Sequence, residues 1–514
     1  MFYFLTHMIS DKLPGLELAM INRLKIFKYN KQPAKIVTFQ YNRFQHLNTK
    51  KYEINDNDFI NLFDYFQNAI SIDSNMFSDN HISKILNKIN HTYPDNELIK
   101  NNNVIEVYDN RKKKVVEIIF FKNSYDLVSN VKWYNFNNVI VREDGYDSRG
   151  FLSITSFFGQ NGGVSSESIY NIQGEVIINF YYHEISRGGN IENTSIHLIF
   201  HNKEKVFFSI QELASFFYDQ LVEIDENAIF IADSSYLVDD SLFGMEKQVK
   251  IYEFWHNTFS STNNQHGNLS DVMVKELSSN KISGYILPTV RGSEELRKRI
   301  PKKIPVYNAT IAINDHKHPI NSNFDSDKII MVSRIDRQKQ IDHAVKAFSL
   351  IHKKRPTAKL YIYGYILDKK YNNELLMLIK ELGLENTIVF EFYTVNKELM
   401  YHNAAVMIMT SQNEGWGMVI NEALSYGVPV VSYDTNYGPA EIITNNEDGY
   451  IVNVDDYHDL AEKVLYILSN KNIRQYFSQS GIENMKRYNI ENIANIWKNL
   501  SKKLLLGDSE GRSK

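Results

Sequence analysis

The opening seventy residues alternate apolar and polar stretches in the manner of an α/β unit. The apolar start MFYFLTHMIS, at 1–10, predicts a strand, and a turn containing Gly15 follows it. LAMINRLKIFKYN at 18–30 has helical periodicity, and AKIVTF at 34–39 predicts a second strand. Strand, glycine turn, helix and strand in this order begin a doubly wound domain.

The periodicity then changes to short β-branched and aromatic segments, from about 75 to 205. Turns such as Gly162-Gly163 and Gly188-Gly189 separate them. They read NVIEVYD, KVVEIIFF, VKWYNF, NVIVRED, FLSITSFF, SIYNIQ, EVIINFYY and SIHLIFH. Such a series predicts an antiparallel meander, inserted within the first α/β domain.

The α/β pattern returns after the meander. NAIFIAD, KQVKIYEFWHN and KISGYILPT read as strands. The predicted organisation has an N-terminal Rossmann-like domain in two parts, a second Rossmann-like domain that binds a donor, helices that cross back to the first domain, and a polar tail. The corresponding ranges are 1–74 and 206–315 around the insert 75–205, then 316–480, 481–506 and 507–514.

Composition narrows the function classes. With 514 residues, 43% of them hydrophobic, the chain is long enough for several cores. A formal charge of −4 does not favour nucleic acid, and the absence of Cys excludes disulfides and thiolate metal sites. We find no apolar run of about 18 residues, and the start lacks a basic segment of a signal peptide. We expect a cytoplasmic protein, and the many Asn, Lys, Ile and Tyr favour a low-GC Gram-positive source.

The most informative segment is 410–449, which reads TSQNEGWGMVINEALSYGVPVVSYDTNYGPAEIITNNEDG. Glu414 and Glu422 stand eight positions apart, with Gly415-Trp416-Gly417 and an apolar helical run between them. Glycines let a backbone approach a ligand, and the helix they open offers N–H groups and a positive dipole end to a diphosphate. At ~1.5 Å per residue the two acids can lie roughly 10 Å apart. This spacing suits hydroxyls at opposite ends of a nucleotide sugar, although two solvated acids beside an ordinary turn would also fit the pair alone.

A second polar cluster follows an upstream strand. IIMVSR at 329–334 ends in Arg334, and Lys339 comes five positions later. Cations at the carboxyl end of a strand can hold a leaving diphosphate. KLYIYG at 359–364 reads as the next strand, with a glycine at its tip. Solvated charges in a polar loop are the alternative interpretation of Arg334 and Lys339.

These motifs resemble the donor site of retaining GT-B glycosyltransferases of the glycogen-synthase-like group, family four. The resemblance implies a GT-B fold, with two Rossmann-like domains facing a cleft. It implies that Glu414 contacts the donor sugar and Glu422 the ribose, and that Arg334 and Lys339 hold the diphosphate. His256, after a strand, would point toward the transferred sugar. The amides that would face the diphosphate belong to Gly415, Trp416, Gly417, Met418 and Val419.

The β-meander insert resembles that of one subgroup. This subgroup contains the wall teichoic acid α-N-acetylglucosaminyltransferases and the enzymes that glycosylate serine-rich or serine–aspartate repeats of adhesins. REDGYDSRGFLS at 142–153 and the opening GLELAMINRLKIFKYNKQPAKIV carry the likeness. Gly15, in that opening, would let the chain approach donor phosphates or the acceptor, or simply form a tight turn. The insert would bind the acceptor or mediate oligomerisation.

The predicted activity is that of a retaining, UDP-sugar-dependent hexosyltransferase that uses UDP-N-acetylglucosamine and no metal. The clustered acids Asp239-Asp240 and Asp455-Asp456 look like loop caps, not metal ligands. The predicted acceptor is the serine hydroxyl, or a sugar already on serine, of a repeat adhesin. Teichoic acid is the alternative. RKKK at 111–114, together with Arg297-Lys298-Arg299 and Lys302-Lys303, could attract either polymer. Each run taken singly is better explained as a solvated face.

A hypothesis of another class is a non-catalytic, acceptor-binding partner of a glycosyltransferase. The presence of all four donor-site residues, Glu414, Glu422, Arg334 and Lys339, favours a catalytic chain. A homo-oligomer or a paralogous partner subunit, and at most peripheral association with a membrane, are compatible with the resemblance.

Overall fold

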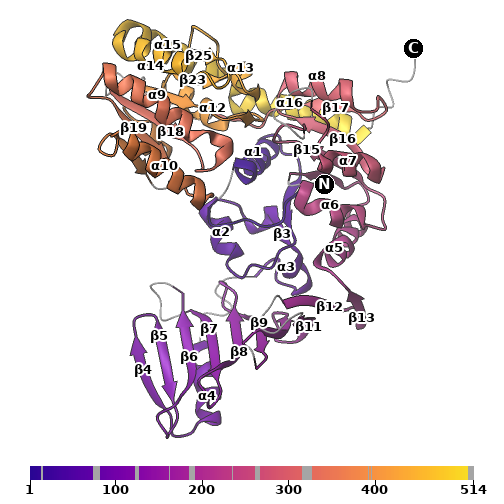
Figure 1. The fold of residues 1–514 in the computed structure, drawn as a ribbon. Helices are drawn as coiled ribbons and strands as arrows, with labels where there is room; N and C mark the ends of the chain where they lie inside the picture. Colours follow the sequence, from indigo (N-terminus) through magenta and orange to yellow (C-terminus); the bar gives the residue numbers. More distant parts are fainter. Residues whose placement is uncertain are drawn as a thin grey trace. The chain divides into compact units, whose positions relative to one another are not determined.

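The computed structural model describes residues 1–12, 15–72, 81–121, 127–160, 162–184, 191–233, 235–260, 267–314, 327–391, 393–394 and 396–506 (Figure 1). Contacts divide the chain into two compact units. The first contains Met1–Glu17 and Pro33–Lys250, and the second contains Leu18–Gln32 and Ile251–Lys514. The boundaries predicted near 75 and 316, the turn Gly188-Gly189 and the predicted tail 507–514 lie outside the described residues.

The first unit contains a parallel sheet whose strands follow the order β14, β1, β2, β3. Its central strand, β1 (Phe2–Leu5), is buried along its whole length, as its apolar sequence predicts. The other strands are β2 (Ala34–Thr38), β3 (Phe59–Asn61) and β14 (Ile229–Ala232). The helices of this part are α2 (Gln45–Lys51), α3 (Leu62–Phe66), α5 (Ile210–Ile224) and α6 (Ser235–Phe243).

The same unit carries an antiparallel sheet in which, among the described residues, ten strands pair in chain order. The meander predicted from the sequence is therefore confirmed. Ile85 and Ile89 of α4 (His81–Thr92) pack on one face of its first strands, where Figure 1 shows the helix. The strands are β4 (Glu97–Asn101), β5 (Val104–Tyr108), β6 (Lys114–Phe120), β7 (Val128–Tyr134), β8 (Ile140–Tyr146), β9 (Leu152–Phe158), β10 (Val164–Tyr170), β11 (Val176–Glu184), β12 (Ile191–Phe200) and β13 (Lys203–Phe207).

A buried charge network joins this sheet to the α/β part of the first unit. Arg149, in the loop after β8, donates to Asp64 of α3 at 2.6 Å and to Asp147 at 2.7 Å. A ring nitrogen of His46 lies 2.9 Å from the other oxygen of Asp64. Burial lowers the pKa of His46, but the hydrogen bond and charge of Asp64 outweigh it and raise that pKa. Burial would raise the pKa of Asp64, yet its two partners hold it below the usual range. The segment singled out by resemblance thus anchors the sheet.

The second unit contains a parallel sheet with the order β20, β19, β18, β21, β23, β25. In chain order this is 3-2-1-4-5-6, the strand order of a doubly wound dinucleotide-binding domain. Its strands are β18 (Lys328–Val332), β19 (Lys359–Tyr363), β20 (Ile388–Glu391), β21 (Val406–Met409), β23 (Val430–Tyr433) and β25 (Gly449–Val452). Its helices are α9 (Ile341–Lys354), α10 (Lys369–Glu381), α11 (Lys397–Tyr401), α12 (Met418–Ser425), α13 (Pro439–Ile442) and α14 (Tyr457–Ser469).

Several segments in the remainder of the second unit pack against Trp497 of the last helix. Trp497 is fully buried, its ring centroid lies 5.8 Å from that of Phe27, and its indole N–H donates to the Thr310 carbonyl at 2.8 Å. The ring of Phe254 stacks on that of Trp497, with 6.1 Å between the ring centroids. The elements are α1 (Gly15–Tyr29), β15 (Lys250–Phe254), α7 (Asp271–Ser279), β16 (Ile282–Leu287), α8 (Val290–Arg299), β17 (Val306–Asn308), α15 (Lys471–Met485) and α16 (Ile490–Leu506). In the described part of the chain, no helix has the length and hydropathy of a membrane span.

Candidate donor site

The cations predicted to hold a diphosphate follow β18, at the carboxyl edge of the parallel sheet that runs from β20 to β25. Arg334 lies two residues beyond the strand, and its guanidinium is 3.3 Å from Asp336. Lys339 ends a single 3-10 turn, Arg337–Lys339, and its Nζ lies 2.7 Å from Oε2 of Glu414. The side chains of this pair are only 14% and 19% exposed. The structure therefore brings together a cation and a carboxylate that stand 75 positions apart in the sequence.

A backbone contact fixes the loop that follows Glu414. A Cβ built on Gly415 would lie 1.8 Å from the carbonyl oxygen of His256. A side chain at this position is excluded, because real Cβ atoms do not approach oxygen so closely. Glycine therefore allows the loop Gly415–Gly417, called the donor loop below, to lie directly against the backbone of His256, two residues after β15. The contact of His256 with the donor loop is made by its backbone. Its ring lies 4.5 Å from that of Phe254.

The helix after this loop starts without a side-chain cap. Gly417, at φ 98°, is the N-cap of α12, a left-handed conformation that glycine adopts without strain. Among the described residues, no side chain caps this helix end. The amides of Met418 and Val419 belong to its first turn, where N–H groups have no intrahelical partner. This end can therefore receive an anion.

Trp416 has a packing role that the sequence did not reveal. Its side chain is buried, its indole N–H donates to Asn421 at 2.5 Å, and its ring meets the edge of Tyr488. The side chain holds the loop on α12 and the following segments. The prediction that Trp416 contacts the donor therefore concerns its backbone amide alone.

Glu422 is held by two residues that the sequence analysis missed. Nζ of Lys397 lies 2.8 Å from its Oε1, and the hydroxyl of Tyr401 donates to its Oε2 at 2.9 Å. Burial, followed by the charge of Glu422, raises the pKa of Tyr401 well above its ordinary value, so the hydroxyl stays protonated. Lys397 and Tyr401 are four positions apart on α11, and this helical spacing was the only available sequence signal.

Comparisons with known proteins identify relatives of this chain. Residues 313–484 match the family described as "Glycosyl transferases group 1", and residues 96–197 match the "GtfB middle domain". The chain is 25% identical, over 97% of its length and 99% of the relative's, to the poly(ribitol-phosphate) alpha-N-acetylglucosaminyltransferase of Staphylococcus aureus. It is 22% identical to the GtfA subunit of the UDP-N-acetylglucosamine–peptide N-acetylglucosaminyltransferase of Streptococcus parasanguinis, with 94% of both chains covered.

The chain is a GT-B glycosyltransferase of group 1. Its fold matches the crystal structure of the pneumococcal O-GlcNAc transferase GtfA in complex with UDP and GlcNAc at a TM-score of 0.83. That match has 18% sequence identity and covers 98% of this chain and 99% of the other. The GT-B fold expected from the sequence is confirmed, and a large antiparallel sheet is present in addition.

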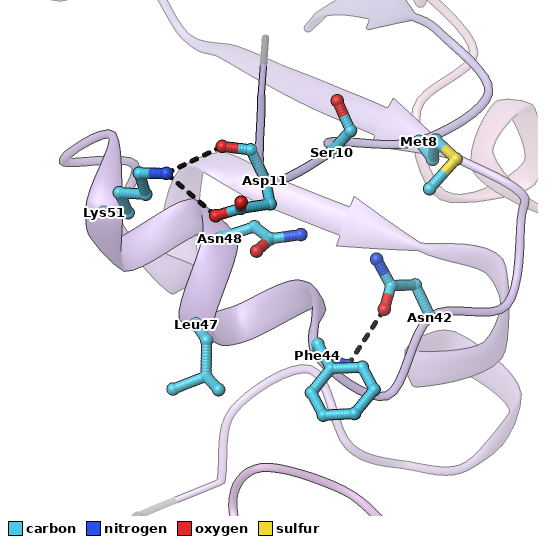
Figure 2. Close-up of a pocket in the computed structure, with 8 residues that line it drawn as sticks. All are labelled: Met8, Ser10, Asp11, Asn42, Phe44, Leu47, Asn48 and Lys51. Atoms are coloured by element: carbon cyan, nitrogen blue, oxygen red, sulfur yellow. Dashed lines mark hydrogen bonds and ion pairs between the residues drawn. The ribbon is translucent and has the colours of Figure 1, made fainter. Parts of the chain in front are cut away.

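The glycosyltransferase also has a pocket in its first unit, at the carboxyl ends of β1 and β2 (Figure 2). Its volume is about 560 Å³. One cation lines it, and that cation, Lys51, lies 2.8 Å from Asp11. The other lining side chains are polar or apolar without charge, so the pocket suits a neutral group that carries hydroxyls. They are Met8, Ser10, Asn42, Phe44, Leu47 and Asn48.

Gly15 begins α1 at an exposed position. A Cβ built there would meet no atom of the described residues within 4 Å. Packing does not require glycine here. The predicted contact of Gly15 with donor or acceptor stays a prediction.

The cations predicted to attract an acidic acceptor are largely engaged within the protein. Lys112 pairs with Glu97 at 2.8 Å, and Lys114 pairs with Glu117 at 3.0 Å and with Glu106 at 3.3 Å. Arg297 donates to the carbonyl of Val306. Two of the four cations of the RKKK segment, Lys112 and Lys114, are therefore paired with glutamates, and the predicted attraction of an acidic acceptor stays a prediction.

Proposed function

We propose that this glycosyltransferase transfers N-acetylglucosamine from UDP-N-acetylglucosamine to serine hydroxyls of a serine-rich or serine–aspartate repeat protein, or to a sugar already on serine. The observation that carries the donor half is the Lys339–Glu414 ion pair, because Glu414 lies just ahead of the uncapped start of α12. Arg334 lies in the same loop after β18 as Lys339, and Glu422 lies within α12. The pneumococcal neighbour was crystallised with UDP and GlcNAc, which supports this donor.

The proposed mechanism retains the anomeric configuration. The acceptor oxygen forms a bond to the anomeric carbon on the face from which the phosphate oxygen departs, and the acceptor proton passes to that phosphate oxygen. Arg334 and Lys339 stabilise the negative charge that develops on the diphosphate, and the amides from Gly415 to Val419 share it. Glu414 accepts hydrogen bonds from the sugar, and His256 faces the sugar. No metal is needed in this scheme.

Teichoic acid is the second candidate acceptor. It is favoured by the 25% identity over almost the full length with an enzyme that acts on poly(ribitol-phosphate). The neutral pocket in the first unit favours a serine or sugar hydroxyl over a polyol phosphate, because its one cation is already paired. A non-catalytic partner role is the alternative of another class, and release of UDP from UDP-N-acetylglucosamine by the purified chain alone would exclude it.

A direct transfer assay tests the proposal. The purified protein is incubated with radiolabelled UDP-N-acetylglucosamine or UDP-glucose, together with a serine–aspartate repeat polypeptide or poly(ribitol-phosphate). We expect label from UDP-N-acetylglucosamine in the polypeptide. Label in the polyol phosphate alone would transfer the assignment to teichoic acid. UDP release without label in either polymer would leave the donor assignment and reject both acceptors.

Exchange of each acid for its amide should separate the roles of the two glutamates. Glu422→Gln should weaken UDP binding by about 1.5–3 kcal/mol, because charge-assisted bonds to the ribose are lost. Glu414→Gln should lower turnover more than UDP affinity, because its proposed partner is the sugar. Calorimetry with UDP, beside turnover measurements, checks both variants. A larger loss of UDP affinity in Glu414→Gln would show that the two roles are exchanged.

We also propose that the β4–β13 sheet holds the acceptor polymer, with oligomerisation as the alternative role of this segment. Cross-strand partners form one row over β7, β8, β9, β10 and β11. The row consists of Trp133, Arg142, Phe157, Ser166 and Tyr181, of which Phe157 and Tyr181 are exposed. The Arg142 guanidinium is held by the buried Asp144 at 2.7 Å and lies 5.7 Å from the Trp133 ring. Strands are about 4.8 Å apart, so the row offers aromatic and cationic contacts along an extended acidic chain.

Loss of two members of this row should weaken acceptor binding without affecting the donor. The double variant Arg142→Gln/Tyr181→Ala should raise KM for a long serine–aspartate repeat by about tenfold, since Arg and Tyr side chains dominate such contacts. Hydrolysis of UDP-N-acetylglucosamine without acceptor should not change. Lys112→Ala, an exposed cation paired with Glu97, is the matched control. An equal loss of transfer to the repeat protein and of UDP-N-acetylglucosamine hydrolysis would show that the sheet is a scaffold.

A further inference from the structure

The carboxylate of Glu422 has a fixed orientation in the described structure. Each of its oxygens has one partner among the described residues: Nζ of Lys397 lies 2.8 Å from Oε1 in an ion pair, and the hydroxyl of Tyr401 donates to Oε2 at 2.9 Å. An ionised carboxylate has about four lone-pair sites, two on each oxygen. One acceptor position on each oxygen is therefore left for a ligand, and rotation of the carboxylate about its terminal bond would break both protein contacts.

Two acceptors side by side on one carboxylate match two adjacent hydroxyl donors. A ribose presents such a pair, its 2′- and 3′-hydroxyls, whereas a 2′-deoxyribose presents only one. A freely rotating carboxylate could satisfy one hydroxyl in many orientations. A carboxylate with fixed orientation recognises the pair, because both hydrogen bonds form without further loss of rotational freedom.

We propose that Lys397 and Tyr401 are positioning residues that orient Glu422 to recognise the vicinal diol of a ribonucleoside diphosphate, and so select ribonucleotide over deoxyribonucleotide donors. This inference rests on the proposed ribose contact of Glu422. The two residues act through Glu422 and are not assigned a contact with the reacting atoms.

The environment of both residues fits this role. Tyr401 is fully buried, and its ring packs on that of Tyr426 with 5.3 Å between centroids, so its hydroxyl is held in place. Lys397 is 37% exposed and is the first residue of α11, directly after the Asn396 cap. The two donors thus approach Glu422 from opposite ends of one short helix, which makes this helix the structural support of the carboxylate.

The test compares binding of UDP and 2′-deoxy-UDP by calorimetry. Wild type should prefer UDP about tenfold or more, the loss expected when one charge-assisted hydrogen bond is removed. Tyr401→Phe and Lys397→Met should each bind UDP about fivefold to twentyfold more weakly. Their affinity for 2′-deoxy-UDP should fall less, so that the preference narrows to about threefold or below. Lys397→Arg, which keeps the positive charge, should retain most of the preference for UDP over 2′-deoxy-UDP.

Two matched variants and one reference variant complete the design. Lys380→Met on α10 and Tyr466→Phe on α14 make the same substitutions at exposed positions and should leave the preference for UDP unchanged.

Glu422→Gln is the reference variant. If Glu422→Gln leaves the preference intact, the ribose role of Glu422 itself is wrong. If Glu422→Gln removes it while both Lys397→Met and Tyr401→Phe retain it, only the present inference is overturned. Tighter UDP binding by Lys397→Met would likewise overturn it, because Lys397 would then compete with the ribose. If Tyr401→Phe does not fold, Lys397→Met decides the question.

Discussion

Replacement of Lys339 by alanine should lower turnover by about 100-fold or more, the scale for loss of one preorganised electrostatic stabiliser. The substitution removes a cation from the proposed diphosphate site and also leaves Glu414 without its partner at 2.7 Å. Arg334→Ala should have an effect of similar size. Steady-state rates of UDP release and of transfer, measured at saturating UDP-N-acetylglucosamine, give the comparison.

Lys346→Ala is the control for this experiment. Lys346 pairs with Asp342 at 3.0 Å on α9, where both side chains are partly exposed. Its removal should change turnover less than twofold, because this pair includes none of the residues assigned to the donor site. The wild-type enzyme should stay active in EDTA, because the two cations are assigned the work of a metal. Complete loss of activity in EDTA, with recovery in manganese, would contradict the metal-free mechanism.

The second large effect is expected from Gly415→Ala. The new Cβ would lie 1.8 Å from the His256 carbonyl oxygen, so either the donor loop or the end of β15 must move. A displacement of about 1 Å at a reacting centre can cost 100-fold in rate. We therefore expect transfer activity to fall by about 100-fold, with a lower midpoint of thermal unfolding. Transfer assays and differential scanning calorimetry measure the two effects.

Gly159→Ala tests whether the effect is specific to the donor loop. A Cβ at Gly159 would come no closer than 3.8 Å to the nearest atom, so both activity and unfolding should remain as in wild type. Near-normal activity of Gly415→Ala would show that the loop can withdraw from His256 without cost, and that this contact does not position Glu414.

Local pattern alone was sufficient for much of the fold. The alternation of short β-branched segments predicted the antiparallel sheet, and the buried apolar run Phe2–Leu5 predicted the first parallel strand. Two strands of this antiparallel sheet were missed, β4 and β13, which read ELIKN and KEKVF. Both are edge strands of the sheet, where charged side chains face solvent, so the hydrophobic signal that identifies inner strands is absent.

The donor-site residues were named from their motifs and from the resemblance to a glycosyltransferase family that these motifs carry. The residues that pair with these side chains were not predicted from the sequence. Lys339 meets Glu414, Glu422 meets Lys397, and Arg149 meets Asp64 across 85 positions, contacts that only the packing of distant elements creates. Sequence spacing restricts which side chains can share a strand end or a helix face. Tertiary packing decides which of them are paired and therefore what each remaining polar group can bind.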